Sequence, residues 1–262
     1  MKQRIPRRFA AALAGGAAAV ALIAGTTAPA AAAPSPAPPS PSSGAPSGPF
    51  AETPTDASAE TPSGPFDFRD CPALPPGVDA AKWRCEVFVM RSSLRIGALD
   101  VPALAPMTVT NAEGPLPDGS RGQVFGALRA PTAPAGGRLR IQPQYGGHAD
   151  FYPDGVHRGA LDMTFRLVHP LLKKGCAIGT ENDPVKLRFV QDGDTEWVSK
   201  EPPVVTFVVH DSTFTAPRTH GCGPLAAPLD RRLGLPAAAG ANALSASAAY
   251  TFRSYAQLPY GR

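Results

Sequence analysis

Apolar and polar residues alternate along several short segments in the C-terminal three quarters of the chain. The clearest alternation covers 161–167, and similar patterns cover 139–142, 185–189 and 244–253. Successive side chains of a β-strand point to opposite faces, so each pattern predicts a strand with one buried and one solvated face. Weaker patterns predict further strands at 85–90, 94–101, 107–110, 124–128, 204–210 and 212–215.

Clusters of Gly, Pro, Asn and Asp separate these segments and predict turns at 111–114, 117–119, 136–137, 146–147, 153–155 and 192–194. One short helix is predicted at 228–233, where Pro228 suits the first turn and Gly234 the C-terminal cap. No long helical pattern lies between the predicted strands. The sequence therefore predicts a single all-β domain over 67–262: an antiparallel sandwich, immunoglobulin-like or jelly-roll-like, with one short helix.

The start of the chain has the pattern of a secretory signal peptide. Residues 1–8 carry four cations and no acid, 9–25 are apolar, and Ala28-Pro29-Ala30 has the small residues that a signal peptidase recognises. We predict a signal peptide over 1–30, with cleavage after Ala30 or after Ala32. The mature protein is then expected to be secreted and extracellular, or associated with the cell wall, and to have no integral membrane span.

Residues 31–66 are rich in Pro, Ala and Ser, and Pro-Ser-Gly-Pro-Phe occurs twice, at 46–50 and 62–66. Such a composition buries too little apolar surface to offset the entropy of ordering, so we predict a disordered linker. Two interpretations stay open: a stalk that carries the domain away from the cell, or a leader of no selected length.

The net charge depends on the signal peptide. The full chain has 25 Lys+Arg and 21 Asp+Glu, and loss of the four N-terminal cations leaves 21 of each sign. A neutral mature chain without a dense basic run argues against a nucleic-acid partner. Five arginines on the polar phase of predicted strands could face an anionic wall polymer, although a solvated surface balanced by acids is the interpretation we favour: Arg138, Arg140, Arg166, Arg188 and Arg253.

Four cysteines, Cys71, Cys85, Cys176 and Cys222, remain after export, and an even number in a secreted chain indicates disulfides. Three pairings are possible. A Cys71–Cys85 bond would clip the start of the domain to the strand at 85–90, and Cys176–Cys222 would then close a longer loop. A metal site is the alternative, but thiolate zinc sites usually contain a C-x-x-C pair, and this chain has none.

The second cysteine pair lies in recognisable surroundings, at 167–172, 175–179, 183–185, 221–223, 233–236 and 242–243. These segments resemble a group of small exported proteins of actinobacteria whose function is unknown. Ala177 occupies a position where that group is expected to have an aromatic residue. The resemblance implies an exported, mainly β protein, and it favours a bond between Cys176 and Cys222.

Sequence motifs for known catalytic chemistry are missing: G-x-S-x-G, H-E-x-x-H, the phosphate-binding loop and the dinucleotide glycine fingerprint. His210, Asp211 and Ser212 are triad residue types, but neighbours on a strand point to opposite faces and cannot form a triad together. We therefore predict no catalytic residues and no cofactor.

One loop carries metal-ligand residue types, His148, Asp150, Asp154 and His157. Imidazole and carboxylate groups suit zinc or another divalent ion. The alternative, which we favour, is a solvated loop in which the aspartates bond to the backbone. The acidic segment 192–196 lacks the spacing of a calcium loop and is predicted to be a charged hairpin turn.

Two classes of function remain. The first is a non-enzymatic binding or structural module at the cell envelope or outside the cell. Its partner is unknown, and the candidates are a cell-wall polymer and another envelope protein. The second is a secreted hydrolase whose catalytic residues converge from distant loops.

Overall fold

The computed structural model describes residues 66–258. The predicted signal peptide and all but the last residue of the predicted linker therefore lie outside the described residues. Within 66–258 there are twelve strands, one α-helix and three short 3-10 helices. Their bounds are η1 Ala80–Lys82, β1 Arg84–Ile96, β2 Leu99–Val101, β3 Met107–Pro115, β4 Arg121–Arg129, β5 Ala133–Pro134, β6 Arg140–Asp150, β7 His157–Val168, β8 Ala177–Ile178, β9 Val185–Lys200, β10 Pro203–Asp211, β11 Thr219–His220, η2 Gly223–Leu225, α1 Ala226–Leu233, β12 Asn242–Ser254 and η3 Tyr255–Gln257.

All strands belong to one antiparallel sheet, whose main path runs β4-β3-β1-β12-β10-β9-β7-β6. The short strands add to this path, β2 on β1, β5 on β6, β8 on β7 and β11 on β8. The prediction of an antiparallel all-β fold with one short helix is confirmed.

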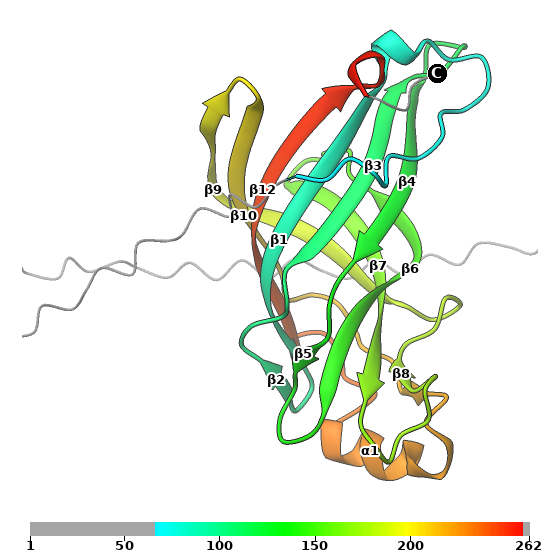
Figure 1. The fold of residues 1–262 in the computed structure, drawn as a ribbon. Coiled ribbons are helices and arrows are strands. Elements are labelled where there is room, and N and C mark those ends of the chain that lie inside the picture. The colour runs from blue at the N-terminus through cyan, green and yellow to red at the C-terminus, as the bar shows by residue number, and fades with distance from the viewer. Residues whose placement is uncertain (1–65, 259–262) are drawn as a thin grey trace, which may run out of the picture. The chain divides into compact units, whose positions relative to one another are not determined.

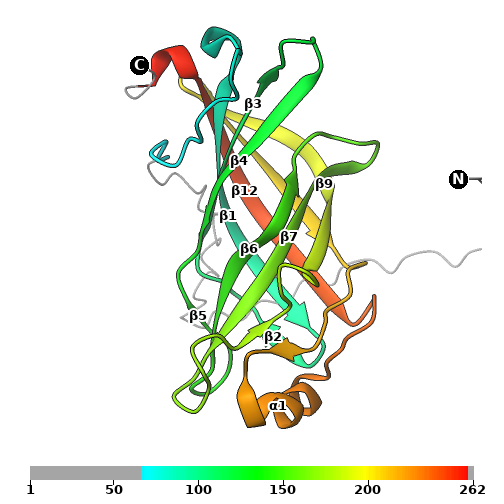
Figure 2. The same ribbon diagram turned by 90° about the vertical axis from the view of Figure 1, so that its right-hand side faces the viewer.

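The sheet curves around its core, so that it forms two layers. Figures 1 and 2 show β12, β1, β3 and β4 on one side, with β6 and β7 behind them. Alternate side chains of each strand fill the space between the layers, and the largest ones that are fully buried include Leu94, Phe165 and Leu187. Because each layer is part of the same sheet, the core forms only where the sheet bends back on itself.

A second, smaller hydrophobic cluster lies on the outer face of β1 and β3, around Trp83. The indole of Trp83 donates a hydrogen bond to the carbonyl of Pro115 at 2.9 Å. Gly114 lies under the ring, where an added Cβ would come within 2.5 Å of it. The Cys71–Cys85 disulfide holds the segment before β1 over this cluster.

The second disulfide joins Cys176 to Cys222, which is the pairing that the resemblance favours. All four cysteines are therefore bonded, and neither pair is left to a metal. The two chain segments approach closely at Gly221, which has φ 69° and where a Cβ would lie 2.2 Å from the carbonyl oxygen of Gly175. Glycine is needed here for both reasons.

The lower end of the fold in Figure 1 is closed by α1 and the segments that flank it. Gly234 caps the helix in the left-handed conformation, as predicted, and the helix begins at Ala226, two residues before the predicted start. The carbonyl of Leu233 accepts the N–H of Ala98 at 2.9 Å, which attaches the helix to the β1–β2 turn. Fully buried Asn242 donates to the carbonyls of Phe214 and Ala238, both at 2.9 Å.

Several local predictions are wrong. Residues 146–147, predicted as a turn, lie within β6, where the β6–β7 register shifts between Tyr145 and Ala149. The strand predicted at 94–101 is interrupted by a turn at 97–98, which separates β1 from β2. Residues 111–114 continue β3, because Asn111 places its side chain in the interior and Gly114 fits under Trp83. Residues 192–194 lie within β9, and the hairpin turn follows Lys200 instead. Residues 212–215 form no strand, because the Asp211 carboxylate bonds the N–H and hydroxyl of Thr213 and turns the chain.

In the described part of the chain, no helix is long and apolar enough to cross a membrane.

Candidate functional site

The two ends of the main strand path, β4 and β6, face each other along a seam. At the lower end of the seam, β5 continues the chain from β4 and pairs with β6, Ala133 opposite Ile141. At the upper end, the Tyr152 hydroxyl donates to the carbonyl of Gly122 at 2.7 Å, and the N–H of Phe151 donates to the side chain of Gln123 at 3.0 Å. Between these points β4 and β6 share no backbone ladder within the described residues.

Two opposed prolines explain the opening. The N–H of Ala135 donates to the carbonyl of Leu139 at 2.8 Å, so these residues are a hydrogen-bonded pair of the hairpin centred on Gly137. Hydrogen-bonded pairs alternate along an antiparallel ladder, and the same register places Pro131 opposite Pro143 in a pair of this kind. Both donors of that pair are missing, because proline has no N–H. The ladder cannot continue through this point.

Side chains hold the seam together where the backbone does not. The Gln142 side-chain amide donates to the carbonyl of Ala130 at 2.7 Å. Further up, the rings of Phe125 on β4 and Tyr145 on β6 stack with centroids 3.8 Å apart and an interplanar angle of 9°. The seam is therefore bridged above and below a gap.

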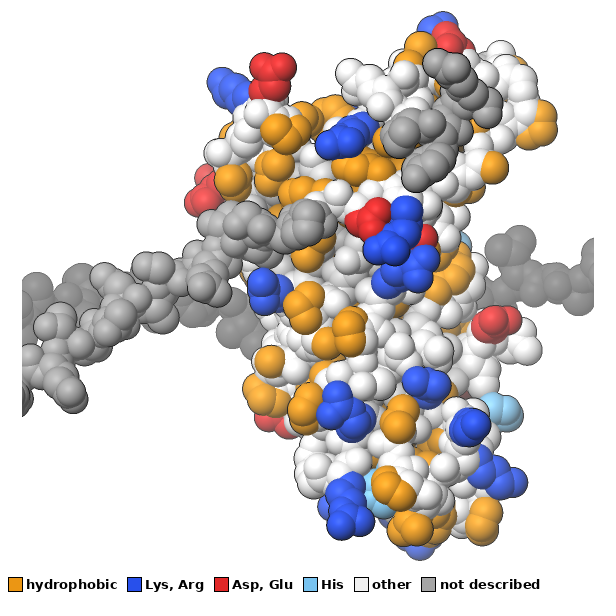
Figure 3. Space-filling view, in the orientation of Figure 1, with side chains coloured by type: hydrophobic (Ala, Val, Ile, Leu, Met, Phe, Trp, Pro, Cys, Tyr) orange, Lys and Arg blue, Asp and Glu red, His pale blue; other side chains and the backbone are white. Residues whose placement is uncertain are grey.

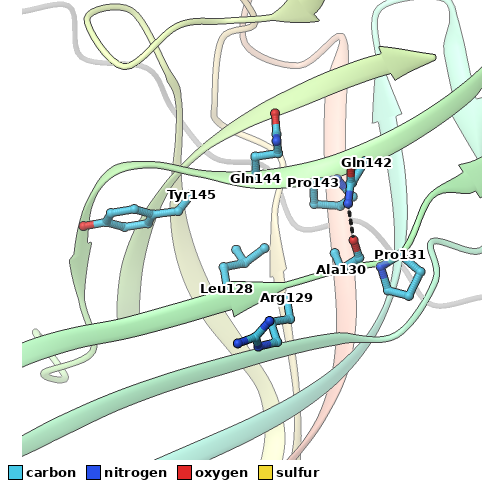
Figure 4. A pocket seen from close by; sticks show the side chains of 8 residues that line it. All are labelled: Leu128, Arg129, Ala130, Pro131, Gln142, Pro143, Gln144 and Tyr145. Carbon is cyan, nitrogen blue, oxygen red and sulfur yellow. Dashed lines mark hydrogen bonds between the residues drawn. The ribbon is translucent and has the colours of Figure 1, made fainter. Parts of the chain in front are cut away.

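The gap is a pocket of about 600 Å³. Figure 4 shows the end of β4 along one side of it and β6 along the other. Its lining residues are Leu128, Arg129, Ala130, Pro131, Gln142, Pro143, Gln144 and Tyr145. The volume lies within the range of known ligand pockets, roughly 300–1,000 Å³.

The lining is polar with little net charge. Arg129 is its only charged residue, and Asp70 forms a two-point ion pair with that guanidinium from outside the pocket. The amides of Gln142 and Gln144 and the hydroxyl of Tyr145 offer both donors and acceptors. Such a site suits a neutral, extended ligand with amide-like groups.

A second polar cluster lies at the upper end of the fold, on the inner face of β1, β3 and β12. The carboxylate of Glu86 is 3% exposed and accepts hydrogen bonds from Arg84 at 2.7 Å, Tyr250 at 2.7 Å and Asn111 at 3.0 Å. Arg84 also pairs with Glu113. The side-chain oxygen of Asn111 is buried and has no partner within the described residues.

Burial of the Glu86 carboxyl raises its pKa, and the nearby charge of Glu113 raises it further. The hydrogen bond from Tyr250, the positive charge of Arg84 and the hydrogen bond from Asn111 lower this pKa but do not outweigh burial. Burial and the Glu86 charge likewise raise the pKa of Tyr250, so its hydroxyl stays protonated and remains a donor.

Half-buried aromatic rings surround this cluster. Phe88 is within 4.8 Å of Tyr250, 5.4 Å of Phe151 and 6.4 Å of Phe207, measured between ring centroids. The guanidinium of Arg84 lies 5.0 Å from the ring of Phe252. These rings join β1, β10, β12 and the segment after β6, so they close the upper interior around the buried charges.

The candidate metal ligands of the 148–157 segment do not converge. The described residues contain no group of three or more His, Cys, Asp or Glu side chains that could hold a metal ion. Asp150 accepts the N–H of Tyr152 at 2.9 Å, and the backbones of Asp154 and His157 form an isolated bridge. His148 is exposed on β6. Of the two aspartates, Asp150 makes the side-chain contact to the backbone that a solvated loop would show, whereas the Asp154 contacts are between backbone groups.

His210 does not form a catalytic arrangement with its sequence neighbours. Its Nδ1 lies 2.8 Å from the carboxylate of Asp192 on the adjacent strand β9, while Asp211 turns inward and accepts the N–H of Arg188. No histidine lines the pocket between β4 and β6.

The arginines predicted on polar strand phases do not gather into one block. Arg140 donates to Thr132, and Arg253 lies over the ring of Phe68 at 4.6 Å from its centroid. On the face shown in Figure 3, Lys and Arg side chains are spaced among uncharged ones.

We find no family model, no curated protein and no solved structure that matches this chain.

The sequence analysis did not identify the pocket between β4 and β6 or the Glu86 cluster, although a feature of the sequence indicates each of them. Pro131 and Pro143 lie at equal distances on either side of Gly137, which is the centre of the predicted turn. Glu86 lies two residues before Phe88 on the same strand face, so an acid occupies the apolar phase of β1.

Restoring the two missing donors should close the seam. In the Pro131→Thr, Pro143→Val double variant, both new N–H groups can join the hydrogen-bonded pair. We expect both amides to be protected in hydrogen exchange measured by NMR. Amides that exchange as fast as those of an unstructured loop would contradict this account of the opening.

The raised pKa of Glu86 predicts a pH-dependent stability. The folded protein binds this proton more tightly than the unfolded chain, so its contribution to stability is largest below the unfolded pKa near 4.5 and is lost as pH rises through the folded pKa. Glu86→Gln does not titrate and keeps a side-chain acceptor. Its melting temperature relative to wild type should therefore increase between about pH 4 and pH 7.

The matched control is Glu181→Gln, at an exposed carboxyl outside the cluster. The difference between its melting temperature and that of wild type should stay constant over this pH range. If the melting-temperature difference for Glu86→Gln is also independent of pH, the account of a raised Glu86 pKa is wrong.

Proposed function

We propose that this protein is an exported, non-enzymatic binding module that holds an extended polypeptide segment of an envelope or extracellular partner in the seam between β4 and β6. The observation that carries the proposal is the pocket of about 600 Å³ between two strand edges that share no backbone ladder. An extended polypeptide has amide donors and acceptors along its length, as strand edges do, and strand addition is a common mode of peptide recognition.

The chemistry of the pocket supports a polypeptide over a charged polymer. Asp70 already neutralises Arg129, and the remaining polar groups are the amides of Gln142 and Gln144 and the Tyr145 hydroxyl. A polyanionic wall polymer would need several free cations at the site. An uncharged main chain needs paired donors and acceptors, which these side chains provide.

Export is the second part of the proposal. The N-terminal charge and apolar pattern support it, as does the presence of two disulfides, which persist in oxidising compartments. The resemblance to small exported proteins of actinobacteria points in the same direction. Three residues of the pocket lining, Arg129, Pro131 and Gln144, are exposed, so a partner has access to the pocket.

Photo-crosslinking from inside the pocket tests the binding site. A benzophenone amino acid is placed at exposed Gln144 in the full chain, expressed in the producing cells, and irradiated in the culture. We expect crosslinks to one or a few partner proteins, with the attachment points in extended segments when mapped by mass spectrometry. The same amino acid at exposed Glu181, outside the pocket, is the control.

The Pro131→Thr, Pro143→Val variant carrying the same crosslinker should lose these products, since its seam is expected to close. Equal products from positions 144 and 181, products that survive closure of the seam, or attachment to glycan alone would overturn the proposal.

Fractionation of the same cultures tests export. We expect the chain to begin at residue 31 or 33, in the medium or released from the wall by salt, with both disulfides intact. A full-length form that requires detergent for extraction would exclude export while leaving the seam result valid.

A further inference from the structure

The tip of the β3–β4 hairpin carries a second hollow, of about 240 Å³, at the upper end of the fold in Figures 1 and 2. Its walls include Glu113 on β3, Arg121 on β4 and Tyr152 from the segment after β6. It shares no lining residue with the seam pocket. An inference about it is therefore independent of the proposed function.

Opposite charges face this hollow from two neighbouring strands. In the β3–β4 register Glu113 pairs with Gln123 and Pro115 with Arg121, so Glu113 and Arg121 are diagonal neighbours on one face. Diagonal neighbours lie about 7–8 Å apart. The two side chains do not form an ion pair with each other, and Arg121 has no acidic partner among the residues that the structure describes.

Each charge is held in place by a contact outside the hollow. The guanidinium of Arg121 lies over the ring of Tyr152, 4.0 Å from its centroid, and the Tyr152 hydroxyl is bonded to Gly122. The side chain of Glu113 is 13% exposed, and one of its carboxylate oxygens contacts Arg84. The other oxygen is left for a ligand.

The charge of the acidic wall depends on Glu86 as well as on Glu113, because both carboxyls share Arg84. That single guanidinium pairs with two carboxylates, Glu86 and Glu113, so the three groups together carry one negative charge when both acids are ionised. Arg121 supplies a positive charge on the opposite wall. The hollow therefore presents two separated charges of opposite sign, with the ring of Tyr152 beside Arg121.

We infer that this hollow binds a small zwitterion of the free α-amino acid class. Its ammonium group donates to the free oxygen of Glu113, its carboxylate accepts from the guanidinium of Arg121, and its side chain lies against Tyr152. Arginine suits this role because its planar group binds a carboxylate at two points. The volume is below the usual range for drug-sized ligands, which restricts the site to a small molecule.

Titration of the isotope-labelled full chain, followed by NMR, tests this inference. The probes are L-alanine and L-leucine, each with its N-acetyl derivative, which lacks the ammonium charge, and its amide, which lacks the carboxylate. We expect saturable shifts at the amides of Gly119, Ser120 and Arg121 with the free amino acids. Both derivatives should bind at least about tenfold more weakly, because each loses one charge-assisted contact.

Arg121→Gln should weaken binding of the amino acids about tenfold or more. Arg91→Gln, at another exposed arginine that does not line the hollow, is the matched control and should bind as wild type does. Both positions are exposed, so both variants are expected to fold, which the dispersion of the same spectra shows directly.

Absence of saturable shifts at millimolar amino acid would overturn the inference, as would equal binding of the derivatives or equal loss in both arginine variants. The Pro131→Thr, Pro143→Val variant should keep its affinity for amino acids, which separates this site from the seam.

Discussion

A single sheet can close around one core only if its two end strands, here β4 and β6, come together. The opposed prolines Pro131 and Pro143 prevent backbone hydrogen bonds at the place where these strands meet. Every other neighbouring pair along the main path is joined by a backbone ladder. At the seam, β5 and β6 restore the ladder below the prolines, and side chains replace it above. The pocket exists because two donors are missing from one hydrogen-bonded pair, while the surrounding contacts keep β4 and β6 near each other.

The buried polar groups at the two ends of the fold have different partners. At the lower end, Asn242 and Asp230 bond to backbone and hydroxyl groups, and they fix the segments around α1. At the upper end, Glu86 places a carboxyl in the interior near aromatic rings, and its partner Arg84 remains partly exposed. A buried, paired charge contributes little net stability compared with an apolar residue, so this arrangement is costly to keep for stability alone. The predicted pH dependence of the stability follows from it.

The disulfides attach the parts that the core does not hold. Cys71–Cys85 fixes the entering segment across Trp83, and Asp70 in that segment reaches Arg129 beside the seam pocket. Cys176–Cys222 fixes the turn after β7 to the segment that leads into α1. Such links limit local opening of segments with few buried contacts.

Alternation of apolar and polar residues determined the antiparallel all-β class, most strand positions and the helix with its Gly234 cap, because these depend on local periodicity and on backbone preferences of single residues. The same reasoning was wrong at 111–114 and 192–194, where turn-forming residues serve in strands: Asn111 bonds Glu86, and Asp192 bonds His210 on the next strand.

The candidate sites were decided by the tertiary structure. The equal spacing of Pro131 and Pro143 from Gly137 indicates that the two prolines oppose each other in a hairpin. The pocket, however, also requires the whole sheet to curve so that β4 comes to lie beside β6. Glu113 and Arg121 become the walls of one hollow only when Tyr152 arrives from the segment after β6. Such contacts join residues that are distant in sequence, and no local pattern encodes them, because they depend on how the whole sheet bends.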